Sequence, residues 1–160
     1  MHKILIIDDE EEILSTYKRL LELNSYDVDP LSNPTEAATF LRNDYSCIIL
    51  DVKMPGKSGI DILKEIKELN LKTPVIMLSD KSNVPVAVEA LKEGAHDFVD
   101  KIESSDRFLL AVKNAVQHYE LKFENETLLE EIFSNYKMIV QSRLMQDIIS
   151  QINIIADTKA

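Results

Sequence analysis

The most informative segment of this chain is Tyr45-Ser46-Cys47-Ile48-Ile49-Leu50-Asp51-Val52-Lys53-Met54-Pro55-Gly56-Lys57-Ser58-Gly59. It begins with a short apolar run, reaches a single carboxylate at Asp51, and continues into a loop with proline and glycine. A continuous apolar run bounded by turn residues is typical of a strand buried on both faces, as in a parallel sheet. Asp51 would then lie at the carboxyl end of that strand, where open α/β sheets place their ligands. A simpler interpretation is that Asp51 only caps the next helix.

The same order of a strand pattern followed by a helix pattern recurs along the first 105 residues. Apolar strand patterns lie at residues 3–7, 26–31, 47–50, 75–78 and 96–99, and helical spacing follows each one, beginning near residues 12, 33, 60, 84 and 104. Short connections that contain one helix require parallel strands and right-handed crossovers. The sequence therefore predicts an α/β fold with a doubly wound, five-stranded parallel sheet. We place 26–31 near an edge, and we expect Ala87, Val88 and Leu91 to face the core.

Polar side chains follow four of the predicted strands: Asp8 and Asp9, Asp51, Ser79, and Lys101. Because the carboxyl ends of parallel strands share one edge, we expect these groups to meet. Three carboxylates would repel one another unless a divalent cation such as Mg²⁺ binds them. A carboxylate beside such a cation can attack a phosphoryl group, whose oxygens Lys101 and Ser79 would contact. Each residue alone also has an ordinary explanation, as part of a helix start, a turn cap or a surface lysine.

The bulk composition excludes several classes of protein. The formal net charge of −10 argues against direct binding of nucleic acid or of an anionic membrane. Cys47 is the only cysteine, so no intramolecular disulfide can form, and its apolar neighbours predict a buried thiol. We find no signal peptide, no membrane-spanning run and no Walker A motif. The sequence therefore predicts a cytoplasmic protein without membrane contact or ATPase activity of its own.

The last predicted helix is unusually long, because no glycine or proline interrupts it from Ser104 to Phe133. Its apolar residues have the alternating spacing of three and four that is typical of a two-stranded coiled coil; they are Leu109, Val112, Val116, Tyr119 and Phe123. Glu126 and Glu130 weaken the pattern further on. We therefore expect either a homodimer through the 104–133 helix or a final helix that frays into an acidic tail. Residues 138–160 form a separate amphipathic piece.

Taken together, the motifs resemble the receiver domain of two-component response regulators over about residues 1–120. The residues that carry the resemblance are Asp8-Asp9-Glu10, Asp51 followed by Met54-Pro55-Gly56, Ser79, and Phe98 three residues before Lys101. The resemblance implies the strand order 2-1-3-4-5 and a sensor histidine kinase that donates a phosphoryl group to Asp51. The family is a signalling module rather than an enzyme.

The resemblance also implies a metal site and a switch. It implies Mg²⁺ (or Mn²⁺) bound by Asp9, Asp51 and the backbone carbonyl of Lys53, with Asp8 acting mostly through water. In the implied switch, Ser79 moves toward the phosphoryl oxygen and Phe98 follows inward. Such a switch is a two-state element that the phosphoryl group biases through different contacts in each state.

Two residues depart from the family pattern. Ile102 stands where the family usually has a proline in a cis bond, and a cis bond before a non-proline residue costs about 3 kcal/mol. The Lys101–Ile102 bond is therefore either strained or trans, which bears on the reach of Lys101. Asp80 stands where a small residue is usual, and its carboxylate would alter the rate at which a phosphoryl group is gained or lost.

The C-terminal piece is similar to the segment that enters the AAA+ domain of sigma-54-dependent, NtrC-like transcriptional activators. The similarity rests on Met138-Ile139-Val140-Gln141-Ser142-Arg143-Leu144-Met145 and Ala156-Asp157-Thr158, with Val140 in place of the usual glycine. It implies a receiver at 1–120, a last helix and linker at 104–135, and the start of a truncated AAA+ domain at 138–160. ATP and DNA would then be bound only by domains absent from this chain.

Three functions remain open on the sequence. The first is a receiver that phosphorylation switches, and the second is an interaction module of the same fold that no longer needs phosphorylation. Only Asp80 and Ile102 favour the second. The third is a Mg²⁺-dependent phosphohydrolase of the haloacid dehalogenase type. It ranks last, because such enzymes carry D-x-D directly after the first strand, where this chain has Asp8-Asp9-Glu10.

Overall fold

The computed structural model describes residues 1–80 and 84–157; residues 81–83 and 158–160 lie outside the described part, and so does Thr158 of the C-terminal motif. The chain divides into two compact units, Met1–Glu120 and Leu121–Ala160. The elements in chain order are β1 (Lys3–Ile7), α1 (Glu11–Leu23), β2 (Asp27–Leu31), a 3₁₀ turn (Pro34–Glu36), α2 (Ala37–Phe40), β3 (Cys47–Asp51), α3 (Gly59–Glu68), β4 (Val75–Ser79), α4 (Val84–Lys92), β5 (Asp97–Asp100) and α5 (Ser105–Asp157).

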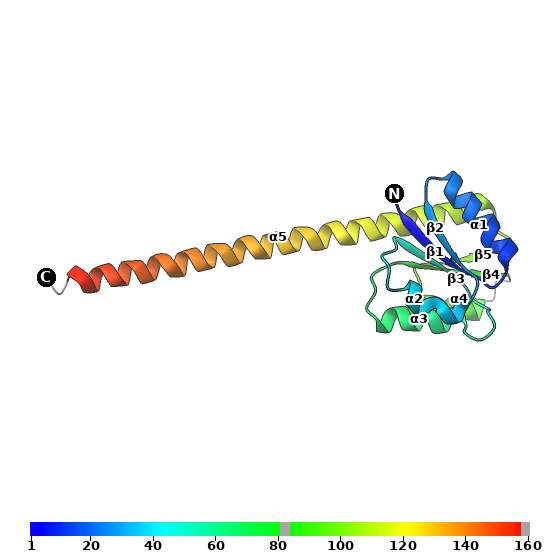
Figure 1. Ribbon diagram of the computed structural model, residues 1–160, viewed down its shortest axis with the longest axis horizontal. Helices are drawn as coiled ribbons and strands as arrows, with labels where there is room; N and C mark the ends of the chain where they lie inside the picture. The colour runs from blue at the N-terminus through cyan, green and yellow to red at the C-terminus, as the bar shows by residue number, and fades with distance from the viewer. Residues whose placement is uncertain (81–83, 158–160) are drawn as a thin grey trace. The chain divides into compact units, whose positions relative to one another are not determined.

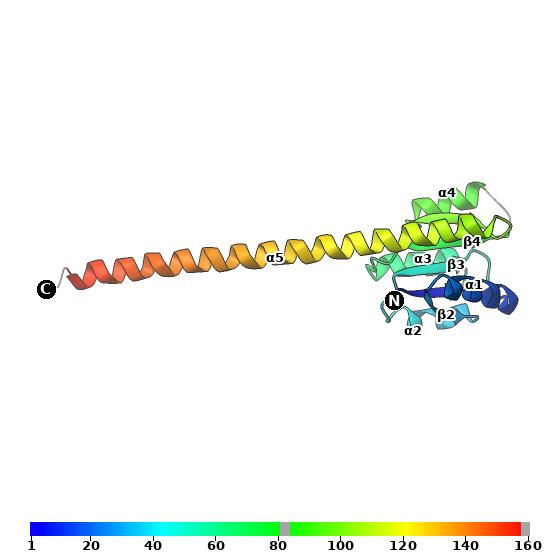
Figure 2. The ribbon, with the colours of Figure 1, turned by 90° about the horizontal axis from the view of Figure 1, so that it is seen from above.

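The first unit is built on one parallel sheet with the order β2-β1-β3-β4-β5. In this unit α1 and the first turns of α5 cover one face of the sheet, and α2, α3 and α4 cover the other (Figure 1). The strand order can be followed from β2 toward β4 in Figure 2. The predicted fold class, the strand order and the edge position of 26–31 are confirmed.

The core lies on both faces of the sheet, which explains why the central strands are apolar without alternation. In β1, Ile4 and Ile6 pack on the side of α1 and α5, whereas Leu5 and Ile7 pack on the side of α2 and α3. All residues of β3 and β4 are buried. Cys47 is a free, buried thiol as predicted, and burial raises its pKa well above the usual value. The polar ends of these strands are thus held on a rigid, dry scaffold.

The predicted inner face of α4 is partly wrong. Val88 and Leu91 are exposed, whereas Ala90 is buried and Val86 packs against the core. The helix contains several apolar residues on more than one side, so its sequence allows more than one orientation. Contact with the sheet selects the face with the small Ala90. Gly94 follows the helix with φ +99°, a left-handed conformation that is typical of a glycine just after the end of a helix.

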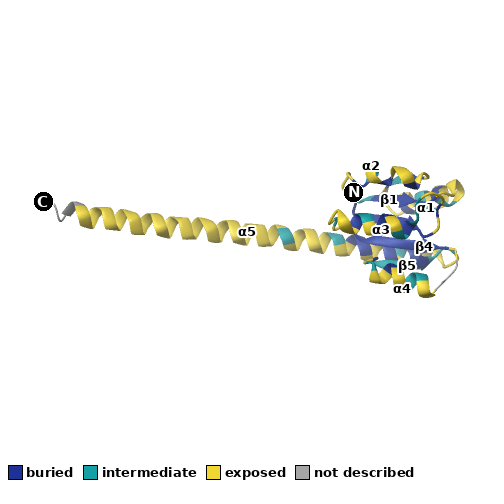
Figure 3. Cartoon of the chain, turned by 90° about the horizontal axis from the view of Figure 1, so that it is seen from below, coloured by how far each residue is buried: buried dark blue, intermediate teal, exposed yellow. Residues whose placement is uncertain are grey.

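Helix α5 is continuous from Ser105 to Asp157, so no break separates residues 133 and 138. Val112 and Val116 are buried in the domain's own core beside Ile4 and Leu14. The prediction that the stripe beginning at Leu109 forms a seam between two chains is therefore wrong for these residues. Beyond Glu120 the described side chains are almost all exposed (Figure 3). No described helix is both long and apolar enough to cross a membrane.

Candidate functional site: an acidic pocket

The carboxyl ends of four strands bring the predicted polar residues together. Asp8 follows β1, Asp51 ends β3, Ser79 ends β4, and Lys101 follows β5. The Lys101 Nζ atom lies 2.7 Å from Asp8 Oδ2 and 3.2 Å from Asp51 Oδ1. The backbone N–H of Lys101 donates to the carbonyl of Ser79 at 2.8 Å, which continues the β4–β5 pairing beyond β5. Lys101 therefore joins the ends of three other strands, and one of its partners, Asp8, lies 93 positions earlier in the sequence.

Three carboxylates of this pocket could hold one metal ion. Asp8, Asp9 and Asp51 each offer an oxygen, and these oxygens all lie within 4.8 Å of one another. Asp8 and Asp51 are buried and Asp9 is exposed, so the cluster has a dry side and a side open to water. Mg²⁺ prefers carboxylate oxygens and retains several waters, and Mn²⁺ accepts the same oxygen ligands. The donor set therefore fits the expected cation.

The charges in the pocket are not balanced by Lys101 alone. Burial raises the pKa of Asp51 to about 6; the charge of Lys101 opposes this shift, and the carboxylate of Asp8 adds to it. For Lys101 itself, burial lowers the pKa, but the hydrogen bond with Asp8 and the charge of Asp51 outweigh burial and raise it. The lysine therefore stays protonated, while an ionised Asp51 remains costly. A divalent cation at this position would offset that cost.

A small cavity of about 130 Å³ opens beside the carboxylate of Asp51. It is lined by Asp51, Lys53, Ser79 and Asp80. Asp51 and Ser79 are buried, while Lys53 and Asp80 are exposed at its mouth. A group attached to Asp51 would thus have the side chain of Ser79 as a neighbour. The expected role of the Lys53 carbonyl stays a prediction.

Gly59, which the sequence motifs did not identify, lets the start of α3 lie directly against the backbone of Asp51. A Cβ atom on Gly59 would lie 2.0 Å from the backbone oxygen of Asp51, so only glycine fits there. Ser58 caps α3 at this point through a reciprocal pair of hydrogen bonds with Asp61. The start of α3 is thereby held against the peptide of Asp51. A glycine at the first position of a predicted helix was the available signal, because glycine is unfavourable in helices.

The two departures from the family pattern leave the pocket intact. The described part of the chain has no cis peptide bond, so the Lys101–Ile102 bond is trans, and Lys101 nevertheless reaches Asp8 and Asp51. The Asp80 Oδ1 atom lies 3.8 Å from Lys101 Nζ and its side chain is exposed. Phe98 is partly buried and packs against the core on the side of α3 and α4.

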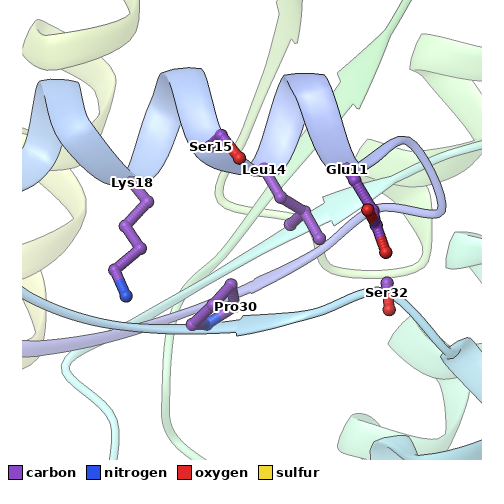
Figure 4. A pocket seen from close by; sticks show the side chains of 6 residues that line it. All are labelled: Glu11, Leu14, Ser15, Lys18, Pro30 and Ser32. Carbon is purple, nitrogen blue, oxygen red and sulfur yellow. The ribbon is translucent and has the colours of Figure 1, made fainter.

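A second hollow lies between α1 and the segment of β2, with a volume of about 220 Å³. Glu11, Leu14, Ser15 and Lys18 line it from the helix, and Pro30 and Ser32 line it from the other side (Figure 4). Its carboxylate and its ammonium group stand at separate positions along α1 rather than converging on one point (Figure 4). The hollow therefore offers no counterpart to the acidic pocket, which is the candidate functional site.

Known receiver domains share this fold and match this sequence. Residues 4–113 match the response regulator receiver domain family, so the chain belongs to this family. The C4-dicarboxylate transport transcriptional regulatory protein DctD of Rhizobium meliloti (strain 1021) is 29% identical over 159 residues, which cover 97% of this chain and 35% of DctD. The chain thus spans about a third of that relative's length.

Two solved structures show the same domain. The response regulator receiver domain protein from Clostridium thermocellum is 36% identical with a TM-score of 0.71, covering 76% of this chain and 98% of that chain. The beryllofluoride-activated NtrC4 receiver domain dimer is 35% identical with a TM-score of 0.69, covering 74% of this chain and 99% of that chain. The similarity to both is confined to about three quarters of the present chain.

Proposed function

We propose that this chain is a phosphorylation-dependent receiver, in which Asp51 accepts a phosphoryl group from a sensor histidine kinase. The observation that carries the proposal is the buried carboxylate of Asp51, which faces a small cavity and lies 3.2 Å from the ammonium group of Lys101. Catalysis here consists of positioning and charge neutralisation, because phosphoryl transfer needs little else from a protein.

The chemistry follows from the atoms in the pocket. A carboxylate oxygen of Asp51 attacks the phosphorus, the bond to the donor nitrogen breaks, and its electron pair remains on the imidazole of the donor histidine. Asp9, Asp51 and the Lys53 carbonyl would hold Mg²⁺, with Asp8 acting through water, and the ion would supply charge neutralisation for the phosphoryl oxygens. Lys101 pairs with one phosphoryl oxygen, and the Ser79 hydroxyl donates a hydrogen bond to another.

The structural change that follows phosphorylation spreads from the pocket along β4 and β5. Ser79 ends β4, and Phe98 lies on the neighbouring strand β5, where it is paired with Met77. When Ser79 turns toward the phosphoryl group, Phe98 moves into the space that becomes free. The surface formed by β5 and its neighbours then differs between the two states, which is what a partner can recognise.

Chemical trapping of the phosphorylated residue tests this function. After incubation with acetyl phosphate and Mg²⁺, borohydride should convert the acyl phosphate of Asp51 to homoserine, which peptide mass spectrometry locates. The exposed Asp44 serves as an internal control and should remain aspartate. Absence of homoserine in a folded, Mg²⁺-loaded protein would favour the phosphorylation-independent interaction module instead.

The exposed part of α5 supports a homodimer, with a register that differs from the one expected from sequence. Leu121, Leu128, Ile132 and Ile139 are exposed and follow the coiled-coil spacing, with Asn125 and Asn135 at the two inner positions between them. Isoleucine at one inner position and leucine at the other are typical of parallel two-stranded coiled coils, and the two asparagines lower the stability of this seam. We place the dimer contact in residues 121–139 of the predicted 104–133 helix and its continuation.

The output of the receiver is proposed to be transcriptional. The match to the transcriptional regulator DctD covers 97% of this chain and so extends past the receiver, in line with the sigma-54 activator resemblance of residues 138–160. ATP and DNA would be bound by other domains in the cytoplasm, and the net charge of −10 is unfavourable for DNA binding here. This chain alone should accordingly bind neither ATP nor DNA in a filter assay.

A further inference from the structure

Two histidine side chains meet on the first unit, far from the acidic pocket. The ring centres of His96 and His118 are 5.0 Å apart, with an angle of 37° between the ring planes. His96 immediately precedes β5, so it stands at the amino end of the sheet, whereas Lys101 and the pocket stand at the carboxyl end. His118 is exposed on α5 and His96 is half-buried.

The separation of the rings matches that of two imidazoles bound to one metal ion. Metal–nitrogen bonds to histidine are about 2.0–2.1 Å, which places each ring centre about 3.2 Å from the ion. Ligand angles between a right angle and the tetrahedral value then separate the ring centres by about 4.5–5.2 Å. The observed 5.0 Å falls inside this range.

The backbone holds both histidines in place before any ion binds. The backbone N–H of His96 donates to the carbonyl of Val75 at 2.7 Å, as an extension of the β4–β5 pairing. His118 follows Ala115 and Val116, which are buried against the sheet and fix the rotation of α5. The two side chains thus approach each other from a strand and a helix that are already fixed, so little order is lost on binding.

We propose that His96 and His118 form a binding site for a divalent transition-metal ion of the zinc or copper class, which ties α5 to the start of β5. Imidazole nitrogen suits these ions, whereas Mg²⁺ prefers oxygen. Among the described residues, no group of three or more histidine, cysteine, aspartate and glutamate ligands contains this pair, and water would supply the remaining ligands of the ion. The site is independent of the proposed phosphoryl chemistry, and its ion differs from that of the acidic pocket.

The proposed ion would add to a contact that already joins the same two elements. Arg107 of α5 donates two hydrogen bonds of 3.0 Å to the carboxylate of Asp97, the first residue of β5. A second link at His96 and His118 would fix α5 at two points along its length. Because the ion binds only the folded arrangement, it stabilises the domain in proportion to its concentration and affinity.

Calorimetric titration with Cu²⁺ tests the site, using the whole chain and excess Mg²⁺ to fill the acidic pocket. Replacing either partner, by His96→Ala or His118→Ala, should weaken Cu²⁺ binding by about tenfold or more. His2→Ala is the matched control, because His2 is the third histidine of the chain and contacts Ser46 and Glu120 instead. This control should bind Cu²⁺ as the wild type does.

Electron paramagnetic resonance gives a second readout that does not depend on stability. The Cu²⁺ spectrum of the wild type should show coupling to two imidazole nitrogens, and that of His118→Ala to one. His118 is exposed, so this variant remains informative even where His96→Ala folds poorly. Unchanged binding in His118→Ala, or no binding by the wild type, would show that the rings are only in contact and would overturn the proposal.

Discussion

The part of helix α5 up to Glu120 and the part beyond it carry the same apolar spacing but use it differently. In the first part, Phe108 and Val112 are buried against the domain's own sheet. In the second part, Leu128 and Ile132 are exposed on a helix that has no partner within the described chain. Spacing alone therefore identifies a helix and its apolar side, but it does not identify the surface that covers that side.

The sharpest way to test this contrast is to truncate one phenylalanine in each of these two parts of α5. Phe108 is buried and its ring centre lies 4.4 Å from that of Tyr17, so Phe108→Ala should lower the free energy of unfolding by about 3–5 kcal/mol. Phe123→Ala removes an exposed ring and should change it by less than about 0.5 kcal/mol. Urea unfolding measures both, and equal losses would contradict the contrast.

A substitution in the acidic pocket should raise the free energy of unfolding rather than lower it. The pKa of Asp51 rises from 3.8 to about 6 on folding, so the folded protein binds this proton more tightly than the unfolded chain does. The stability that Asp51 contributes therefore falls as pH increases from about 4 to about 6. Near neutral pH without metal, Asp51→Asn should raise the free energy of unfolding by up to about 3 kcal/mol.

The gain in stability of Asp51→Asn should shrink in acid, where the wild-type carboxyl group is protonated. It should also shrink in the presence of Mg²⁺, which neutralises the wild-type carboxylate. Asp44→Asn replaces an exposed carboxylate and should leave stability unchanged. Denaturation curves at several pH values, with and without Mg²⁺, measure the difference. A destabilised Asp51→Asn in metal-free buffer would show that the pocket is not under charge strain.

A charge in the exposed part of α5 beyond Glu120 should affect association rather than folding. Leu128→Asp places a carboxylate at an inner position of the proposed coiled coil and should weaken self-association by about a hundredfold, or roughly 3 kcal/mol. Phe123→Asp is the control, because Phe123 lies outside the register that contains Leu121 and Leu128. Light scattering over a concentration series distinguishes them. A wild type that is monomeric at every concentration would remove the dimer.

The smallest expected effect concerns the mouth of the pocket. Asp80 adds a negative charge where a phosphoryl group must enter. Its Oδ1 atom lies 3.8 Å from the Nζ atom of Lys101, the lysine that would pair with the phosphoryl group. Its carboxylate is exposed, so the interaction is screened by water and amounts to about 1 kcal/mol at most. Asp80→Ala should therefore speed labelling by acetyl phosphate by up to about fivefold. A slower rate would mean that Asp80 assists the reaction instead.

Most of the fold and the pocket could be predicted because they depend on local patterns and one topological rule. Apolar runs define the strands, and parallel strands bring their carboxyl ends to one edge, which places Asp8, Asp51 and Lys101 together. The trans bond before Ile102 could not be predicted, since it depends on whether the loop can reach the pocket without proline.

The remaining misses involve contacts that lie far apart in the sequence. The requirement for Gly59 comes from the backbone of Asp51, and the orientation of α4 comes from how Ala90 meets the sheet. The burial of Val112 likewise depends on strands that precede it by more than sixty residues. Local spacing contains no information about these surfaces, because a helix periodicity is the same against any partner.

Intact mass spectrometry after incubation with acetyl phosphate tests the central claim most directly. The wild-type protein should gain one phosphoryl group when Mg²⁺ is present and none after the metal is chelated, and Asp51→Asn should gain none in either buffer. An adduct that persists in Asp51→Asn, or a folded wild type that remains unmodified with Mg²⁺, would contradict the account.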